Sequence, residues 1–291
     1  MLFTHKSELL YLERARVYQE KGRVIYAQDR EMEAQRFNFP YRNAQVLALG
    51  TGTSITNKAV RLLAEEGVVL VFTGGEGMPY IMTGMLDYHP NEYAQGFIRK
   101  WLSEDQRLEL AKRFLAARFD FTARQAKHGS PIEADDLEKF RRKVIQANSV
   151  KVLMGIEGDE VRNLIYRCCS AHYLSSSDFR REHKGGNDNS PHAQVNQLLN
   201  HGNNLAYALA AGALWHIGIP PFFPLIHGQS RNGGLIFDVA DLIKDGIVAP
   251  WAFELRDESL TKAMGELRYR IKSRKADVFL VDTLKSLAEE E

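Results

Sequence analysis

The chain has 291 residues, of which 44% are hydrophobic and 26% are charged, an ordinary globular composition that supplies core material for one large or two smaller domains. The formal net charge of +1 excludes a global attraction to nucleic acids or acidic membranes. A polyanionic partner would therefore have to bind at local basic patches.

The first third of the chain is β-rich. Alternating apolar residues flank Glu20–Gly22 and predict a hairpin, while the runs at 46–49 and 68–72 are continuously apolar, as in strands covered on both faces. Between these runs, residues 55–66 have helical spacing, with Thr53 or Ser54 as the N-cap and Gly67 at the end. The predicted strands cover residues 15–19, 23–27, 36–39, 46–49, 68–72 and 80–82.

A glycine-containing segment, Gly50–Ser54, lies between a predicted strand and a predicted helix, where phosphate-binding loops occur. It lacks the third glycine of a dinucleotide fingerprint and the lysine of a P-loop. A tight structural turn is the favoured interpretation, with nucleotide binding as the alternative.

From about residue 91 the apolar spacing is helical almost to the C-terminus. Gly129–Pro131 interrupts it, and the acids of residues 132–136 favour the start of a helix that runs towards Met154. A β-rich part followed by helices predicts an α+β protein: a β-rich N-terminal domain of residues 1–86 and an all-α domain of residues 87–291.

Targeting and membrane signals are not evident. Cys168 and Cys169 are adjacent in a predicted helix, so their side chains diverge, which favours a reducing compartment. The apolar region Leu205–Ile226 is interrupted by His216 and three prolines, which predicts a buried helix and exit loop instead of a membrane span. We expect a cytoplasmic protein without a signal peptide or membrane association.

His227, Asp238 and Asp241 form a candidate divalent-metal site that needs further oxygen ligands. In a helix that begins after Gly234, Asp238 faces inward with the apolar residues, and Asp241 lies about one turn further on. A structural pair between the histidine and a carboxylate is the alternative.

Glu157 is a candidate for a further ligand. It lies at a predicted helix junction, four residues before Val161, and so shares the face of the apolar stripe that includes Cys168. A buried carboxylate needs a partner. That partner is either a metal ion or, more simply, a helix N-terminus or an arginine such as Arg162.

Amide side chains repeat at helical spacing at Asn196, Asn200 and Asn203. They either orient metal ligands or bridge helices, and the structural role is favoured. His201 and His216 are interpreted as packing residues.

Several segments together resemble a known family. These are residues 155–162 (GIEGDEVR), residues 196–204 (NQLLNHGNN), and His227 followed by residues 237–242 (FDVADL). In this order they resemble the CRISPR-associated spacer-acquisition integrase, the universal first protein of the adaptation machinery. Residues 49–57 (LGTGTSITN) and the helix that follows resemble the subtype I-F branch. Many members carry a tyrosine where this chain has Asn203 or Asn204, so no role of that tyrosine is carried over.

The resemblance implies a dimerising N-terminal domain and a helical catalytic domain that binds metal and DNA. Glu157, His227 and Asp241 would be the catalytic metal ligands, with Asp238 as a secondary acid. The ion would be Mn²⁺ or Mg²⁺, and the reaction would insert spacer DNA into the repeat array by 3′-hydroxyl attack on a phosphodiester. The implied partners are a second copy of the chain and a small ferredoxin-like adaptation protein, joined in the I-F branch to a helicase–nuclease.

Double-stranded and branched DNA would bind at clustered basic residues. The candidates are Arg162, Arg180, Arg181, Lys184, Arg231, Arg268, Arg270 and Lys272. For the loop of residues 175–192, solvation alone is the alternative, and for the basic run at residues 268–275 the alternative is the solvated face of a terminal helix. Two other functions stay open: a metal-dependent phosphohydrolase of small substrates, and a non-catalytic DNA-binding scaffold.

Overall fold

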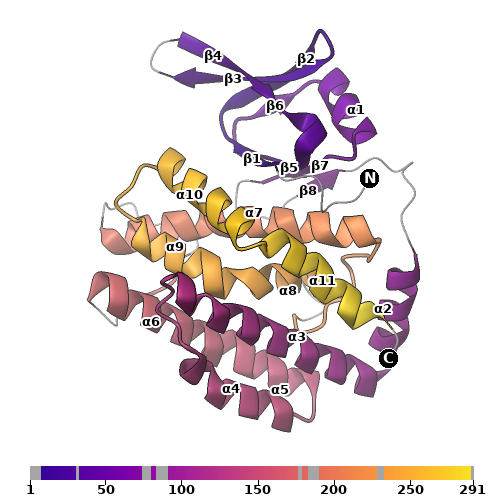
Figure 1. Ribbon diagram of the computed structural model, residues 1–291, viewed down its shortest axis with the longest axis vertical. Coiled ribbons are helices and arrows are strands. Elements are labelled where there is room, and N and C mark those ends of the chain that lie inside the picture. The colour runs from indigo at the N-terminus through magenta and orange to yellow at the C-terminus, as the bar shows by residue number, and fades with distance from the viewer. Residues whose placement is uncertain are drawn as a thin grey trace. The chain divides into compact units, whose positions relative to one another are not determined.

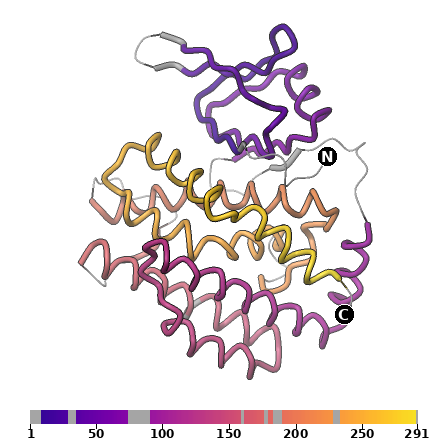
Figure 2. Tube along the Cα trace, viewed as in Figure 1, coloured from indigo at the N-terminus to yellow at the C-terminus, as the bar shows by residue number. Residues whose placement is uncertain are grey.

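The computed structural model describes residues 8–30, 33–73, 80–82, 91–175, 179–182, 190–227 and 233–289. The chain divides into two compact units, residues 1–89 and residues 90–291. The first unit contains the strands and the second is helical, which confirms the predicted α+β class (Figures 1 and 2). None of the helices in the described ranges is long and apolar enough to cross a membrane.

The N-terminal unit contains two four-stranded sheets, ordered β1-β5-β7-β8 and β4-β3-β2-β6. In the first sheet, β5 is buried along its length and pairs in parallel with both β1 and β7, as expected of a continuous apolar run. Strands β1 and β6 were not predicted. The strands are β1 (Glu8–Leu12), β2 (Ala15–Glu20), β3 (Arg23–Arg30), β4 (Glu33–Phe39), β5 (Ala44–Leu49), β6 (Ser54–Ile55), β7 (Val69–Phe72) and β8 (Tyr80–Met82).

The predicted hairpin is confirmed, with β2 antiparallel to β3 around a two-residue turn in which both φ angles are positive. The predicted cap of helix α1 (Asn57–Glu65) is wrong. Thr56 is the N-cap, and its Oγ1 accepts the N–H of Ala59 at 3.4 Å. Thr53 instead donates to the carbonyl of Leu12, and Ser54 pairs in β6.

The segment that follows β5 is a tight turn, as the favoured interpretation held. Gly52 has a φ of +74°, and the N–H of Thr53 donates to the carbonyl of Gly50. A Cβ atom at Gly50 would lie 2.4 Å from Cγ of Glu13 and 2.5 Å from the hydroxyl oxygen of Tyr11. Side chains of the chain itself therefore fill the space beside this glycine.

In the helical unit, the 27-residue helix α7 packs against α8, α9, α10 and α11. Two π-helical segments, η4 and η5, interrupt the α-helical path. The helical elements are α2 (Glu92–Leu102), α3 (Glu104–Arg124), η3 (Ala126–His128), α4 (Ala134–Gln146), α5 (Val150–Gly155), η4 (Ile156–Val161), α6 (Arg162–Leu174), α7 (Pro191–Ile217), α8 (Gly234–Ile243), η5 (Lys244–Val248), α9 (Ala249–Glu254), α10 (Leu260–Ser273) and α11 (Ala276–Ala288).

Two expectations about these helices need correction. The helix predicted to continue to Met154 ends at Gln146, because Ala147 is extended and Ser149 caps α5 as a new helix. Its start is as predicted, with a capping box between Glu133 and Asp136. The basic run of residues 268–275 ends α10 and is followed by α11, so it is not on a terminal helix.

Candidate functional site

Glu157 lies in the π-helical segment η4, where one turn contains an additional residue. Its side chain is 14% exposed, so it points inward as predicted, although π geometry and not the assumed α-helical spacing places it there. In the stripe that follows, Val161, Leu164 and Ile165 are buried as predicted, whereas Cys169 is buried in place of Cys168, which is only partly buried.

The partner of Glu157 is Arg118 of α3, and not Arg162, which is exposed on α6. The Arg118 side chain is 3% exposed, and its Nη1 atom donates to Oε1 of Glu157 at 2.9 Å. The same Nη1 lies 3.8 Å from Oδ2 of Asp241, and Nε donates to Oδ2 of Asp245 at 2.6 Å. Burial alone would lower the pKa of Arg118, but these three carboxylates outweigh it and raise that pKa well above its usual value.

Asp238 holds the segment that carries His227. It is 1% exposed, and its Oδ2 accepts the backbone N–H groups of Leu225 at 2.7 Å and Ile226 at 3.3 Å. Its Oδ1 accepts the backbone N–H of His227 at 3.1 Å and lies 2.7 Å from Nδ1 of the same ring. Both oxygens of the predicted secondary acid are therefore engaged in positioning His227.

The start of α8 brings Asp238 to this segment. Gly233 has a φ of +67° and forms the N-cap, where a left-handed backbone favours glycine. A Cβ atom at Gly234 would lie 2.8 Å from Cβ of Pro224, so the helix start and the segment before His227 are in close contact. The helix predicted to follow Gly234 is thus confirmed.

Asp241, one turn after Asp238, lies between two cations and the imidazole. Its Oδ1 accepts from Nζ of Lys244 at 2.5 Å, and its Oδ2 lies 4.0 Å from Nε2 of His227. Burial would raise the pKa of Asp241, but Lys244, Arg118 and His227 outweigh it and lower that pKa to about 2. Burial likewise lowers the pKa of His227, yet the hydrogen bond to Asp238 and the charges of Asp241, Asp238 and Glu157 raise it above the usual value.

The three predicted ligands are therefore brought together from η4, α8 and the segment before α8. Glu157 and Asp241 share Nη1 of Arg118, and Asp241 also faces Nε2 of His227. Within the described ranges, no three His, Cys, Asp or Glu side chains lie closely enough to form a ready-made metal cluster. In this arrangement Arg118 and Lys244 supply the positive charge that faces the carboxylates.

Sequence reasoning missed Arg118, Lys244 and Asp245, although each left a signal. Lys244 and Asp245 follow Asp241 by three and four residues, the spacing of neighbours on a helix. Arg118 continues the apolar stripe of α3 that includes Phe114, so it occupies a buried position. An arginine there requires acidic partners from elsewhere in the fold.

Asn196 and Asn200 of α7 have a structural role, holding residues 180–182 instead of bridging two helices. Asn196 is 1% exposed, accepts from Arg181 at 3.0 Å and from the backbone N–H of Glu182 at 2.9 Å, and donates to the carbonyls of Arg180 and His192. Asn200 accepts from Arg181 at 2.5 Å. Arg181, a predicted DNA contact, is thus engaged in anchoring residues 180–182 to α7.

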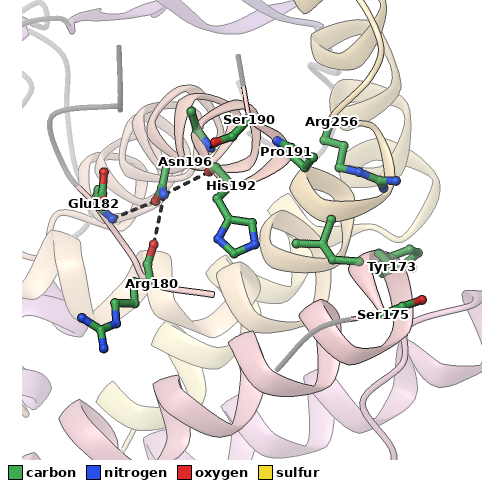
Figure 3. A pocket seen from close by; sticks show the side chains of 11 residues that line it. Tyr173, Ser175, Arg180, Glu182, Ser190, Pro191, His192, Asn196 and Arg256 are labelled. Atoms are coloured by element: carbon green, nitrogen blue, oxygen red, sulfur yellow. Dashed lines mark hydrogen bonds between the residues drawn. The ribbon is translucent and has the colours of Figure 1, made fainter. Parts of the chain in front are cut away.

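A cavity of about 780 Å³ borders this anchored segment, lined by residues of α6, α7 and the loop after α9 (Figure 3). Arg180 and Arg256 lie at opposite sides of the view, with His192 between them (Figure 3). Arg180 is exposed, whereas Nη2 of Arg256 lies 3.3 Å from Asp257. The cavity thus has a basic lining, with Glu182 as its acid.

The remaining predicted DNA contacts differ in exposure. Lys272 is exposed and Arg268 is partly exposed on α10. Arg270 is only 9% exposed and binds Glu254 and Glu266 at 2.9 and 3.0 Å, so it is part of the packing between α9 and α10. Lys184 and Arg231 lie outside the described residues.

Comparison with known proteins gives consistent matches. The family described as "CRISPR associated protein Cas1" matches residues 10–272. A "CRISPR-associated endonuclease Cas1" of Pseudomonas aeruginosa is 35% identical over 99% of this chain and 95% of its own, and one of Pectobacterium atrosepticum is 33% identical over 87% and 82%. The solved TtCas1–DNA complex is 26% identical, with a TM-score of 0.72 over 98% of this chain and 92% of that one. The chain therefore belongs to the Cas1 family of CRISPR-associated proteins.

Proposed function

We propose that this protein is a metal-dependent DNA nuclease and integrase of CRISPR adaptation, which joins the 3′-hydroxyl of a spacer DNA to a phosphodiester of the repeat array. The observation that carries the proposal is the convergence of Glu157, Asp241 and the imidazole of His227 from three separate elements. The names of the Pseudomonas and Pectobacterium relatives as endonucleases support the reaction class, and the TtCas1–DNA complex supports the substrate class.

The donor set fits a divalent ion such as Mn²⁺ or Mg²⁺. His227 would offer Nε2, because Nδ1 is held by Asp238, and a metal-binding histidine usually has its other ring nitrogen held by such a group. Asp241 would offer Oδ2, because Lys244 holds Oδ1, and Glu157 would complete the set. Four carboxylates with Arg118 and Lys244 leave a formal charge of −2 when His227 is neutral, which one divalent ion balances.

When bound, the ion would polarise the target phosphate and stabilise the departing oxygen. The chain's own residues would prepare the site for this. Oδ1 of Asp238 would accept a hydrogen bond from Nδ1–H of His227 and so keep the lone pair of Nε2 directed towards Asp241. In the reaction, the 3′-oxygen of the spacer forms a bond to the phosphorus of the repeat DNA. At the same time, the bond between that phosphorus and the leaving 3′-oxygen of the repeat strand breaks. The attacking hydroxyl loses one proton and the leaving oxygen gains one.

We infer that DNA binds through local cations, since the net charge is only +1. Exposed Arg180 at the cavity of Figure 3 is suited to a backbone phosphate, and exposed Arg162 is a further candidate. Arg256 at the same cavity also donates to the carbonyl of Phe253 and pairs with exposed Asp257, so a phosphate would have to share or replace the contact to Asp257. Arg181 and Arg270 are bound internally, which argues against a direct role for them.

The test is transfer of a 3′-hydroxyl DNA fragment into repeat DNA with Mn²⁺, with a chelator, and with His227→Ala. We expect transfer with Mn²⁺, and its loss with either the chelator or the variant. His172→Ala is the matched control, because His172 is exposed on α6. Undiminished transfer by His227→Ala would contradict the site assignment.

The same assay separates the alternative functions. Hydrolysis of free nucleotides with no action on branched DNA would identify a small-molecule phosphohydrolase. DNA binding with no metal-dependent chemistry would identify a scaffold.

A second copy of the chain and a small ferredoxin-like protein are the partners that we propose. Light scattering of the purified protein tests the first, with the mass of two chains expected. Co-purification with the ferredoxin-like protein, alone or joined to a helicase–nuclease, tests the second.

A further inference from the structure

Arg118 is a buried arginine that contacts carboxylates from three other elements. Nη1 binds Glu157 of η4 at 2.9 Å and lies 3.8 Å from Asp241 of α8, while Nε binds Asp245 of η5 at 2.6 Å. The side chain is 3% exposed. One planar group therefore spans two of the proposed metal ligands and one acid that is not among them.

Asp245 fixes the direction in which the guanidinium points. A guanidinium is rigid and planar, so a bond at Nε determines where Nη1 lies once the plane is set. The backbone around Asp245 is itself constrained, because a Cβ atom at Gly246 would lie 3.1 Å from Cα of Thr122 on α3 and 2.7 Å from Cγ of Gln125. The π-helical segment η5 is thus in close contact with the helix that carries Arg118.

We propose that Arg118, oriented by Asp245, is a positioning residue that sets the separation of Glu157 and Asp241 for a divalent ion. The inference rests on the proposed function. Because Arg118 holds Oε1 of Glu157, Oε2 would be the oxygen offered to an ion, as Oδ2 of Asp241 would be because Lys244 holds Oδ1. Glu157 and Asp241 belong to different elements, so their distance depends on a group that contacts both.

Charge and geometry predict opposite effects for a substitution here, which makes the proposal testable. If Arg118 acted only as a positive charge, removing it would strengthen binding of a divalent cation, because less positive charge would face the ion. If Arg118 sets the geometry, removing it weakens binding despite the more negative site. Lysine retains the charge but is a point donor without the planar fork.

The experiment measures Mn²⁺ affinity of the full chain by calorimetry, with free Mn²⁺ followed by electron paramagnetic resonance. The variants are Arg118→Gln and Arg118→Lys. We expect both to bind Mn²⁺ about 10-fold or more weakly than the unaltered protein, the range seen when a group that orients metal ligands is removed. Arg142→Gln is the matched control, since it removes an exposed arginine paired with Glu138 and should leave the affinity unchanged.

Tighter or unchanged Mn²⁺ binding by Arg118→Gln would overturn the proposal, as would affinity of Arg118→Lys equal to that of the unaltered protein. Circular dichroism establishes that each variant is folded. If Arg118→Gln does not fold, the Mn²⁺ affinity of Arg118→Lys tests the proposal. This variant should fold, because it keeps a buried positive charge beside Asp245. Failure of the proposed function is a separate result: the unaltered protein would then not bind Mn²⁺ at all.

Discussion

Asp238 Oδ1 lies 2.7 Å from Nδ1 of His227, and the same carboxylate accepts three backbone N–H groups of the segment that ends at His227. A single buried acid therefore holds both the ring and the backbone of the histidine. Asp238 therefore positions His227, and both of its oxygens are engaged by this segment.

Replacing Asp238 with asparagine should weaken the proposed metal site. The amide has one acceptor oxygen and an NH₂ donor that would face backbone donors, so His227 loses its fixed orientation. We expect Mn²⁺ affinity and strand transfer to decrease about 10- to 100-fold. Metal titration and the transfer assay measure this, with Asp282→Asn as a control because Asp282 is exposed on α11. Activity of Asp238→Asn within twofold of the unaltered protein would contradict the role.

Asp241 should make the metal-free protein sensitive to acid. Its folded-state pKa is about 2, below the ordinary value of 3.8, so its contribution is present above about pH 4 and is lost as pH falls towards 2. The shift corresponds to a decrease in the free energy of unfolding on the order of 2 kcal/mol. Urea unfolding with chelator, between about pH 5 and pH 2, measures it. Asp241→Asn should lose this part of the pH dependence. If the free energy of unfolding of the variant fell with pH as steeply as that of the unaltered protein, the low pKa would not belong to Asp241.

Asn196→Ala should release residues 180–182 from α7. Asn196 is 1% exposed and binds the backbone or side chain of Arg180, Arg181 and Glu182. Its loss leaves buried polar groups without partners, at a cost of about 1–3 kcal/mol. Hydrogen exchange of this segment should accelerate and DNA affinity should decrease. Asn163→Ala on the exposed face of α6 is the control; equal exchange in both variants would exclude the anchor.

A glycine in tight contact, Gly202 of α7, can be compared with one that has open space, Gly265 of α10. A Cβ atom at Gly202 would lie 2.6 Å from Cγ1 of Val248 and 2.8 Å from Cζ3 of Trp251. At Gly265 in α10, no atom of the described residues lies within 4 Å of such a Cβ, apart from its chain neighbours and the nearby backbone of its own helix. Gly202→Ala should destabilise the protein by about 1–3 kcal/mol through overpacking. Gly265→Ala should stabilise it by about 0.5–1 kcal/mol, because alanine favours a helix. Thermal unfolding measures both, and equal shifts would contradict the packing described.

The cavity arginines should contribute to DNA binding through charge. Arg180→Gln and Arg256→Gln each remove one cation of the lining, so DNA affinity should decrease. The slope of log affinity against log salt concentration should become shallower by about 1, as expected when one phosphate contact is lost. Fluorescence anisotropy at several salt concentrations measures both quantities. Arg142→Gln on α4 is the control, and the same salt slope in all three variants would remove this cavity from the binding surface.

The sequence alone determined the α+β class, the hairpin after β2 and the inward direction of Glu157 and Asp238, because these follow from local periodicity and turn chemistry. It also indicated the family, through short segments in a defined order. Local patterns could not predict the π-helical segment at Glu157, nor that Cys169 and not Cys168 is buried, because residues three and four positions after Ile165 both lie near its face of a helix.

Only the tertiary structure decided which charges meet. Arg118 lies 39 residues before Glu157 and 127 before Asp245, and no periodic pattern links positions so far apart. The packing of α3 against α8 and η5 brings them together. It also decided that Asp238 holds His227, and that Arg181 and Arg270 are bound internally. The physical reason is that burial requires each charge to find a partner, and the fold determines which partner is within reach.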